Sequence, residues 1–208
     1  MKMEQERYEL PDGWEWKKFP DVVWFQEGPG ILKKDFTASG IPLIRISGMS
    51  DYHVSLKGCN YLSTDMVNKK WNHFRLQIDD ILISTSASMN KISIVSEEAY
   101  GAIPYTGLIR FQPNKNLQKK YLYWFFHSNF YSEQIKNNKS GTTIQHYGPT
   151  HLKKMVIPVP PLPEQRRIAD KLDAVLGRID DAIRLSSEPW IRDCIYRKLI
   201  AKTRAYCR

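Results

Sequence analysis

Two polar segments of the sequence gather residue types that contact nucleic acids. One is STSASMNK, where small hydroxyls and an amide precede a lysine, and the other is SGTTIQHY from residue 140 onward. Glycine lets the backbone approach a phosphate closely, while hydroxyl, amide and ammonium groups suit phosphates and base edges. For the histidine and tyrosine, groove or stacking contacts compete with an ordinary structural role. The candidate contact residues are Ser86, Asn90, Lys91, Ser140, Gly141, Thr142, Thr143, Gln145, His146 and Tyr147.

Three basic residues in the first quarter of the chain are further candidates. Lys33 and Lys34 follow Gly28-Pro29-Gly30 and are placed to clamp phosphates. Arg45 lies in a predicted strand, where it could donate two hydrogen bonds to a guanine edge. Solvated lysines and a packed surface arginine are the alternative interpretation of these three residues.

The chain shows no convincing set of catalytic residues. Pro11-Asp12 followed by Glu15-Trp16-Lys17 superficially resembles the PD and ExK signature of restriction nucleases. That chemistry holds a metal between carboxylates on neighbouring strands, and the gap of two residues between Asp12 and Glu15 is too short for it. Cys59, Cys194 and Cys207 lack the CxxC spacing of zinc sites. We therefore predict a protein without catalytic activity, metal or cofactor of its own.

The composition indicates a folded, basic protein with a polyanionic partner. The net charge is +9 and the isoelectric point is about 9.4, which favours nucleic acid, although many proteins are this basic. At 208 residues the chain can bury one good core and carry an appendage. The polar start MKMEQERYELPDGW and the lack of a membrane-length apolar run predict no signal peptide and no membrane span. We expect the protein in the cytoplasm of a prokaryote.

Apolar patterning predicts an α+β fold. Strands are expected over 15–19, 41–47, 78–84, 92–95, 102–111 and 151–159, and one helix over 117–136. In that helix Leu122, Phe125, Phe126 and Phe130 recur at steps of three and four. This spacing favours a core role for the run YLYWFFHSNFY over a base-stacking platform, which needs exposed rings.

The segment IPVPPLPEQRRIADKLDAVL, residues 157–176, predicts an abrupt change from an extended chain to a pairing helix. Its prolines exclude helix up to Pro163, which suits a first helical turn, and Glu164 suits the positive end of the helix dipole. Apolar residues then alternate at steps of four and three, which is a heptad seam. The helix should reach about Ser187 and kink near Pro189. The candidate pairing residues are Ile168, Leu172, Val175, Ile179, Ala182 and Ile183.

The stretch PPLPEQRRIADKLD closely resembles the junction in specificity subunits of type I restriction-modification enzymes. LPDGW, GIPLIRIS, DDILIST and the SGTT loop before HLKKMVIPVP resemble weaker features of that family. The resemblance implies a DNA target recognition domain with a mixed or antiparallel sheet over 1–160. It implies a helical dimerisation and methyltransferase-docking arm over 161–208. The implied partners are double-stranded DNA, methyltransferase subunits that bind S-adenosylmethionine, and the restriction subunit.

Family specificity subunits carry two recognition domains in tandem, whereas this sequence shows one. The resemblance therefore implies a half-size subunit that forms a homodimer and reads a palindromic, interrupted site. Two alternatives stay open. One is a structural protein whose coiled arm is the functional part. The other is a truncated remnant, because AKTRAYCR stands where the family's second helix usually ends in small residues and glycine.

Overall fold

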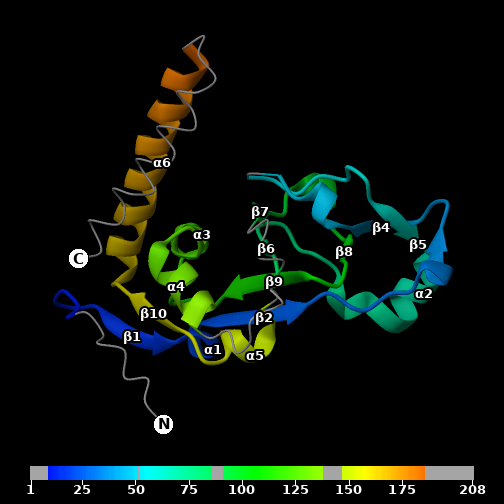
Figure 1. The fold of residues 1–208 in the computed structure, drawn as a ribbon, viewed down its shortest axis with the longest axis horizontal. Coiled ribbons are helices and arrows are strands. Elements are labelled where there is room, and N and C mark those ends of the chain that lie inside the picture. The colour runs from blue at the N-terminus through cyan, green and yellow to red at the C-terminus, as the bar shows by residue number, and fades with distance from the viewer. Residues whose placement is uncertain (1–8, 51, 86–90, 138–146, 186–208) are drawn as a thin grey trace.

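The computed structural model of the protein describes residues 9–50, 52–85, 91–137 and 147–185, without the side chains of 180 and 182–185. Within these residues the strands form one two-stranded and two four-stranded sheets, and a long helix projects from the globular part (Figure 1). Helices combined with antiparallel and mixed sheets confirm the predicted α+β class for the globular part.

The central sheet is antiparallel throughout and is apolar on both faces. Its strands, in spatial order, are β2 (Val23–Glu27), β9 (Leu108–Pro113), β6 (Ile81–Ser84) and β7 (Ile92–Ile94). Successive side chains of a strand point to opposite faces. Ile83 and Ile109 therefore contact one core cluster, and Leu82 and Leu108 contact another. Two covered faces explain why IDDILIS is almost continuously apolar after its aspartates.

A second sheet forms the outer lobe, at the far end of the molecule from the projecting helix (Figure 1). Its strands are β3 (Phe36–Thr37), β5 (Asn60–Leu62), β4 (Ile41–Ile44) and β8 (Ile103–Pro104), and α2 (Thr64–Met66) follows β5. The β4–β8 pair is parallel, with Leu43 opposite Ile103. The core of this lobe consists of Ile31, Leu43, Leu62, Val67 and Ile103.

Two aromatic helices, α3 (Lys119–Phe126) and α4 (Asn129–Asn137), pack against the central sheet. The ring of Phe126 lies 4.8 Å from that of Phe111 and 5.0 Å from that of Tyr131, measured between centroids. The core role predicted for the aromatic run is confirmed, because these rings are buried. The single helix predicted over 117–136 is wrong. Ser128 interrupts it, since its Oγ accepts the Tyr131 N–H at 3.1 Å as an N-cap of α4.

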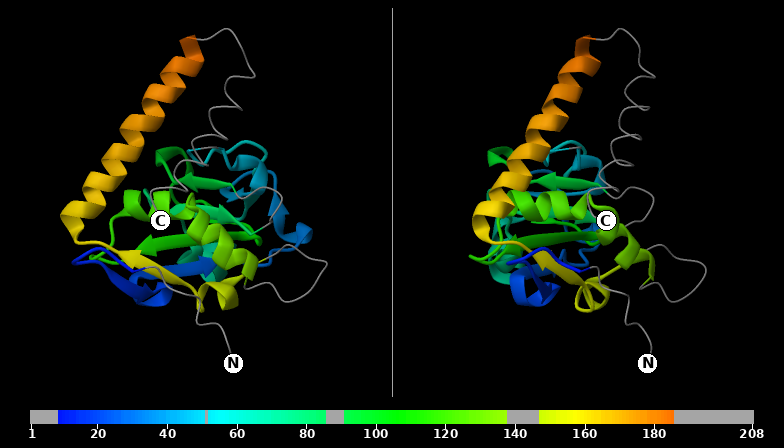
Figure 2. Two further views of the ribbon diagram at one scale, coloured as in Figure 1. Left: turned by 60° about the vertical axis from the view of Figure 1, so that its left-hand side comes forward. Right: turned by 90° about the vertical axis from the view of Figure 1, so that its left-hand side faces the viewer.

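The first and last strands of the globular part pair with each other. β1 (Glu15–Lys18), which leads into α1 (Phe19–Val22), is antiparallel to β10 (Val156–Val159). The strand predicted over 151–159 is wrong in its first half, because His151 and Leu152 belong to the helical turn α5 (Pro149–Leu152). Gly148 precedes this turn and Pro149 occupies its first position. Beyond β10, the chain passes through Pro160 and Pro161 into the long helix α6 (Leu162–Leu185), shown from two sides in Figure 2.

The remaining strand predictions are confirmed with shorter bounds. The segments 41–47, 78–84 and 92–95 contain β4, β6 and β7, and 102–111 contains β8 and most of β9. The strands β2, β3 and β5 were not predicted. In particular, β2 follows α1 with no turn residue between them, so the sequence carries no boundary signal there. No helix in the described part of the chain is long and apolar enough to span a bilayer.

Candidate nucleic-acid interface

The described residues that flank the two polar segments contact each other. The backbone N–H of Tyr147 donates to the carbonyl of Thr85 at 3.4 Å, and the N–H of Thr85 donates to Gly107 at 2.8 Å. Thr85 directly precedes segment 86–90, and Tyr147 directly follows segment 138–146. The described residues next to the two segments therefore meet just after the end of β6. The candidates within them lie outside the described residues: Ser86, Asn90, Ser140, Gly141, Thr142, Thr143, Gln145 and His146.

A hollow of about 600 Å³ lies beside this anchoring point. Its wall is largely apolar and also carries hydroxyl groups, glycine backbone, one carboxylate and one imidazole. The lining residues are Glu27, Ile46, Thr85, Thr106, Gly107, Tyr147, Gly148, Pro149, Thr150 and His151. The hollow thus lies where the ends of β2 and β6 meet the outer lobe.

Arg45 is exposed and directly precedes Ile46, one of the residues that line this hollow. The prediction that Arg45 lies in a strand is wrong, because β4 ends at Ile44. Its Nη1 donates to Oδ1 of Asn60 at 3.2 Å, and its guanidinium lies 5.8 Å from the ring centroid of Tyr105. These two contacts hold the guanidinium in place and leave further N–H groups for a ligand.

Tyr105 connects Arg45 to the segment that carries the two candidate lysines. The Tyr105 hydroxyl donates to the carbonyl of Ile31 at 3.1 Å. Lys33 and Lys34 then begin an exposed 3-10 turn, Lys33–Asp35. Tyr105 therefore links Arg45 to the backbone just before the two lysines, and we call Lys33, Lys34 and Arg45 the basic rim. Tyr105 was not predicted, because one aromatic residue in a strand-like stretch resembles any core residue.

Gly28 directly follows β2, and glycine is required there because the Tyr105 segment lies close to its backbone. A Cβ on Gly28 would lie 2.3 Å from the carbonyl oxygen of Pro104 and 2.4 Å from that of Tyr105. Real Cβ atoms do not approach backbone oxygens so closely, so only glycine allows this packing. The end of β2 and the Tyr105 segment are thereby held against each other beside the hollow.

The structure corrects the stacking contact predicted for Tyr147. This side chain is 2% exposed, and its hydroxyl hydrogen-bonds that of Tyr131 at 2.9 Å. Burial raises the pKa of both phenols, which therefore stay neutral. A buried ring cannot stack on a base, so Tyr147 anchors the preceding segment instead. Lys91 is half-buried, and its Nζ donates to the carbonyl of Met49 at 2.9 Å.

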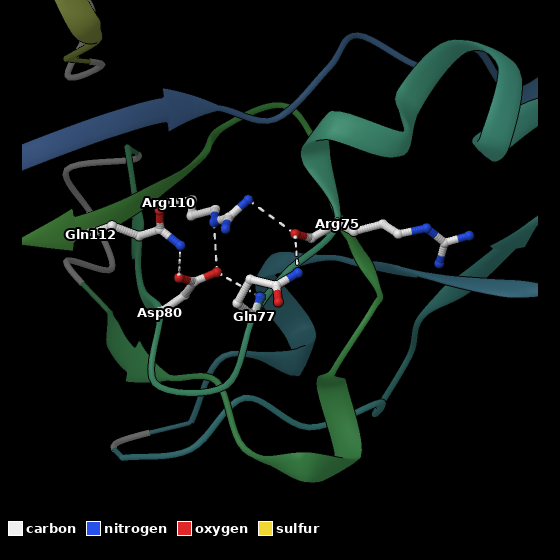
Figure 3. Close-up of polar contacts among 5 residues, drawn as sticks. All are labelled: Arg75, Gln77, Asp80, Arg110 and Gln112. Carbon is white, nitrogen blue, oxygen red and sulfur yellow. Dashed lines mark hydrogen bonds and ion pairs between the residues drawn. The ribbon is translucent and has the colours of Figure 1, made fainter.

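A buried polar network that the sequence did not reveal ties the central sheet to the outer lobe (Figure 3). Nε of Arg110 lies 2.5 Å from Oδ2 of Asp80, and its Nη1 donates to the Arg75 carbonyl at 3.0 Å. Gln112 and the Gln77 N–H also donate to the Asp80 carboxylate, at 2.6 and 2.7 Å. Burial raises the pKa of Asp80, and these donors oppose the rise. Both charges are enclosed, so the network positions backbone and offers no open catalytic group.

The residues considered for nuclease chemistry form ordinary surface contacts. Glu15 pairs with Lys17 on β1, and the hydrogen bond from Lys17 lowers the pKa of Glu15. Among the residues that the structure describes, no group of three or more His, Cys, Asp or Glu side chains is arranged to hold a metal ion.

The candidate pairing residues of α6 occupy different environments. Ile168 packs against the core of its own domain, and Leu172 and Ile179 are half-buried. Val175 is 37% exposed. The side chains of Ala182 and Ile183 lie outside the description, as does the kink predicted near Pro189.

A family model described as "Type I restriction modification DNA specificity domain" matches residues 11–184. The putative type I restriction enzyme MjaX specificity subunit of Methanocaldococcus jannaschii is 27% identical over 183 residues, covering 84% of this chain and 43% of that protein. The EcoBI specificity subunit of Escherichia coli is 29% identical over 186 residues, covering 88% of this chain and 36% of that protein. This chain therefore spans less than half the length of these relatives.

Solved structures share the fold. The HsdS subunit from Thermoanaerobacter tengcongensis superposes with a TM-score of 0.66 at 22% identity, covering 96% of this chain and 46% of that one. A chain from a structural study of complex assembly and conformational transition of the type I R-M system gives a TM-score of 0.69 at 20% identity. That match covers 98% of this chain and 46% of the other.

Proposed function

Because this chain belongs to the type I restriction modification DNA specificity domain family, we propose that it reads one half of an interrupted DNA site and catalyses no reaction itself. The observation that carries this proposal is the convergence at one edge of the molecule. Thr85 and Tyr147, which flank two segments rich in hydroxyl and amide groups, meet there beside a hollow lined by Ile46, the residue after Arg45. Arginine beside small hydroxyl and amide groups is suited to reading base edges in the major groove.

In this proposal Lys33 and Lys34 supply non-specific affinity, and Arg45 and the two segments supply specificity. Lys33 and Lys34 contact phosphates, which fixes the register of the duplex without reading its sequence. Arg45, Lys91 and the polar residues of 86–90 and 140–146 face the bases and neighbouring phosphates. The net charge of +9 agrees with a polyanionic ligand.

The second part of the proposal is that two copies of the chain form a homodimer on a palindromic site. The helix α6 continues beyond the globular part (Figure 2). Val175 and Ile179 are four residues apart and therefore share one side of it. Its 24 residues span about 36 Å at 1.5 Å per residue, close to the 34–36 Å of one DNA turn. A two-fold dimer reads two inverted half-sites.

The proposed protein partners are methyltransferase subunits, which would bind S-adenosylmethionine and perform the chemistry, and the restriction subunit. The arm over 161–208 would dock the methyltransferase and pair with its copy. In this scheme the complex acts on DNA in the cytoplasm.

Selection from randomised DNA duplexes tests the proposal. The full chain is co-expressed with a type I methyltransferase subunit, and the complex selects duplexes that are then sequenced. We expect an interrupted palindrome whose adenines the complex methylates. A complex that assembles but enriches no sequence would favour a structural scaffold. Failure to bind either the methyltransferase or DNA would favour a truncated remnant.

A further inference from the structure

The first part of α6 is fastened to α3 by a buried amide. Gln165 is 0% exposed, and its Oε1 accepts the backbone N–H of Gln118 at 2.8 Å. Its Nε2 donates to the carbonyls of Asn116 and Pro160 at 3.0 and 2.8 Å. One side chain therefore joins the start of α3, the loop before it and the end of β10. A buried amide with these partners is costly to displace, because each partner would be left unpaired.

A second attachment lies two turns farther along the same side of α6. Oδ1 of Asp173 accepts the indole N–H of Trp124 at 2.8 Å, and its Oδ2 accepts from Nζ of Lys120 at 2.9 Å. Between the two attachments, Ala169 is 0% exposed. Residues four apart lie on the same face of a helix, so Gln165, Ala169 and Asp173 form one docking face. We call Gln165, Asp173 and their partners on α3 the arm bracket.

Two attachment points determine the direction of a helix, whereas one would leave it free to swing. Gln165 and Asp173 are eight residues apart, or about 12 Å along the axis. The apolar residues Val175 and Ile179 follow beyond the bracket and are therefore presented at a fixed angle to the globular part.

We propose that the arm bracket holds α6 at one angle to the recognition domain and thereby fixes the number of base pairs between the two half-sites. This inference rests on the proposed function, because it requires two domains joined through their arms on one duplex. A change in the angle at each domain moves the two hollows relative to each other. The bracket residues are positioning residues and do not contact DNA.

The angle is measurable on the full chain without DNA. Spin labels at Tyr100→Cys and Arg178→Cys, in a background with Cys59, Cys194 and Cys207 replaced by serine, report the distance between outer lobe and arm. Both positions are exposed. An excess of unlabelled chain isolates the distance within one protomer. We expect one narrow distance distribution in the native chain and a broadened or shifted one in Gln165→Leu and in Asp173→Ala.

The matched control is Asp170→Ala. Asp170 lies one turn before Asp173, is 72% exposed and approaches Lys120 only to 3.9 Å, so its replacement should leave the distribution unchanged. Circular dichroism checks that each variant is folded, and Asp173→Ala keeps the measurement informative if Gln165→Leu does not fold. Equal distance distributions in the native chain and in Asp173→Ala would overturn the proposal that the arm bracket fixes the angle of α6.

The spacing role is read from the duplex selection. The native complex should select one spacer length, whereas Asp173→Ala should select the same half-sites over at least two lengths. An unchanged single spacer in Asp173→Ala, despite a broadened distance distribution, would overturn the spacing role. If the native complex selects no interrupted site, the proposed function and the spacing role both fail. The spin-label distances still decide whether the bracket fixes the arm.

Discussion

At the scale of single residues, the Asp80–Arg110 pair should contribute strongly to stability. Arg110→Met leaves a buried carboxylate without its arginine, and breaking a buried pair in this way costs about 3–5 kcal/mol. Denaturation with urea at neutral pH measures the loss. The control Arg178→Met removes an exposed arginine from α6 and should change the free energy of unfolding by less than about 0.5 kcal/mol. A loss of that small size in Arg110→Met would contradict the prediction.

The same variant should show a distinctive pH dependence. Burial raises the pKa of Asp80 in the folded state, so its protonated form favours folding and this stability is lost as pH rises through the folded pKa. Removing Arg110 strengthens the effect, because an attractive charge that opposed the rise is gone. The stability loss of Arg110→Met, relative to the native chain, should therefore shrink as the pH is lowered from neutral toward the ordinary pKa of aspartate. A loss that grows on acidification would contradict this sign.

Arg45 should determine affinity for the selected site. Arg45→Ala removes a guanidinium held at the rim by Asn60 and Tyr105, and a good bidentate contact to a base discriminates by about 1–3 kcal/mol. Affinity should fall about 10-fold to 100-fold, and the preference at one base pair should relax. Fluorescence anisotropy with the selected duplex and its point variants measures both effects. Lys57→Ala, at another exposed cation of the outer lobe, should leave the base preference unchanged.

At the scale of elements, the contact between β2 and the Tyr105 segment should tolerate no side chain. Gly28→Ala places a Cβ against two backbone oxygens and should lower the free energy of unfolding by roughly 1–3 kcal/mol. Gly30→Ala is the matched control, because a Cβ there meets nothing within 4 Å. Thermal unfolding of both variants compares them directly. Equal melting temperatures would show that the contact at Gly28 relaxes easily.

The outer apolar side of α6 should mediate dimerisation. Val175→Asp combined with Ile179→Asp should give monomers, because each buried aliphatic side chain contributes about 1.5–3 kcal/mol. Size-exclusion chromatography with light scattering measures the mass. Ala174→Asp adds a charge at an exposed neighbouring position and should remain dimeric. Ile168 is unsuitable for this test, because its replacement would disturb the core of its own domain.

The elements show what the sequence could and could not predict. Heptad spacing predicted α6, but it also assigned Ile168 to the pairing seam. An apolar residue at that position serves a partner helix or its own domain equally well, and periodicity cannot distinguish them. The proline junction predicted where the helix begins, whereas the buried contacts of Gln165 depend on a loop 49 residues earlier in the chain. The hollow and its rim could not be predicted, because Thr85, Tyr105 and Gly148 converge only through tertiary contacts.

At the scale of the whole molecule, charge should govern non-specific binding. Replacing Lys33 and Lys34 by alanine removes two exposed cations per protomer. Each lost phosphate contact reduces the slope of log affinity against log salt concentration by about one. The slope for the proposed dimer should therefore become shallower by about four, with little change in base preference. Titration of a random duplex at several salt concentrations measures it. Lys171→Ala on α6 should leave the slope unchanged.

The pairing of β1 with β10 has a consequence for how the chain folds during synthesis. The two strands are about 140 residues apart, so β1 leaves the ribosome first and finds its partner only when the domain is almost complete. At about 5–20 residues per second, it remains an open edge for roughly 10–30 s. Its sequence EWKK places charges on that edge, and charged edge strands resist pairing with other chains. We therefore expect the charges of β1 to reduce pairing with other chains until β10 is available.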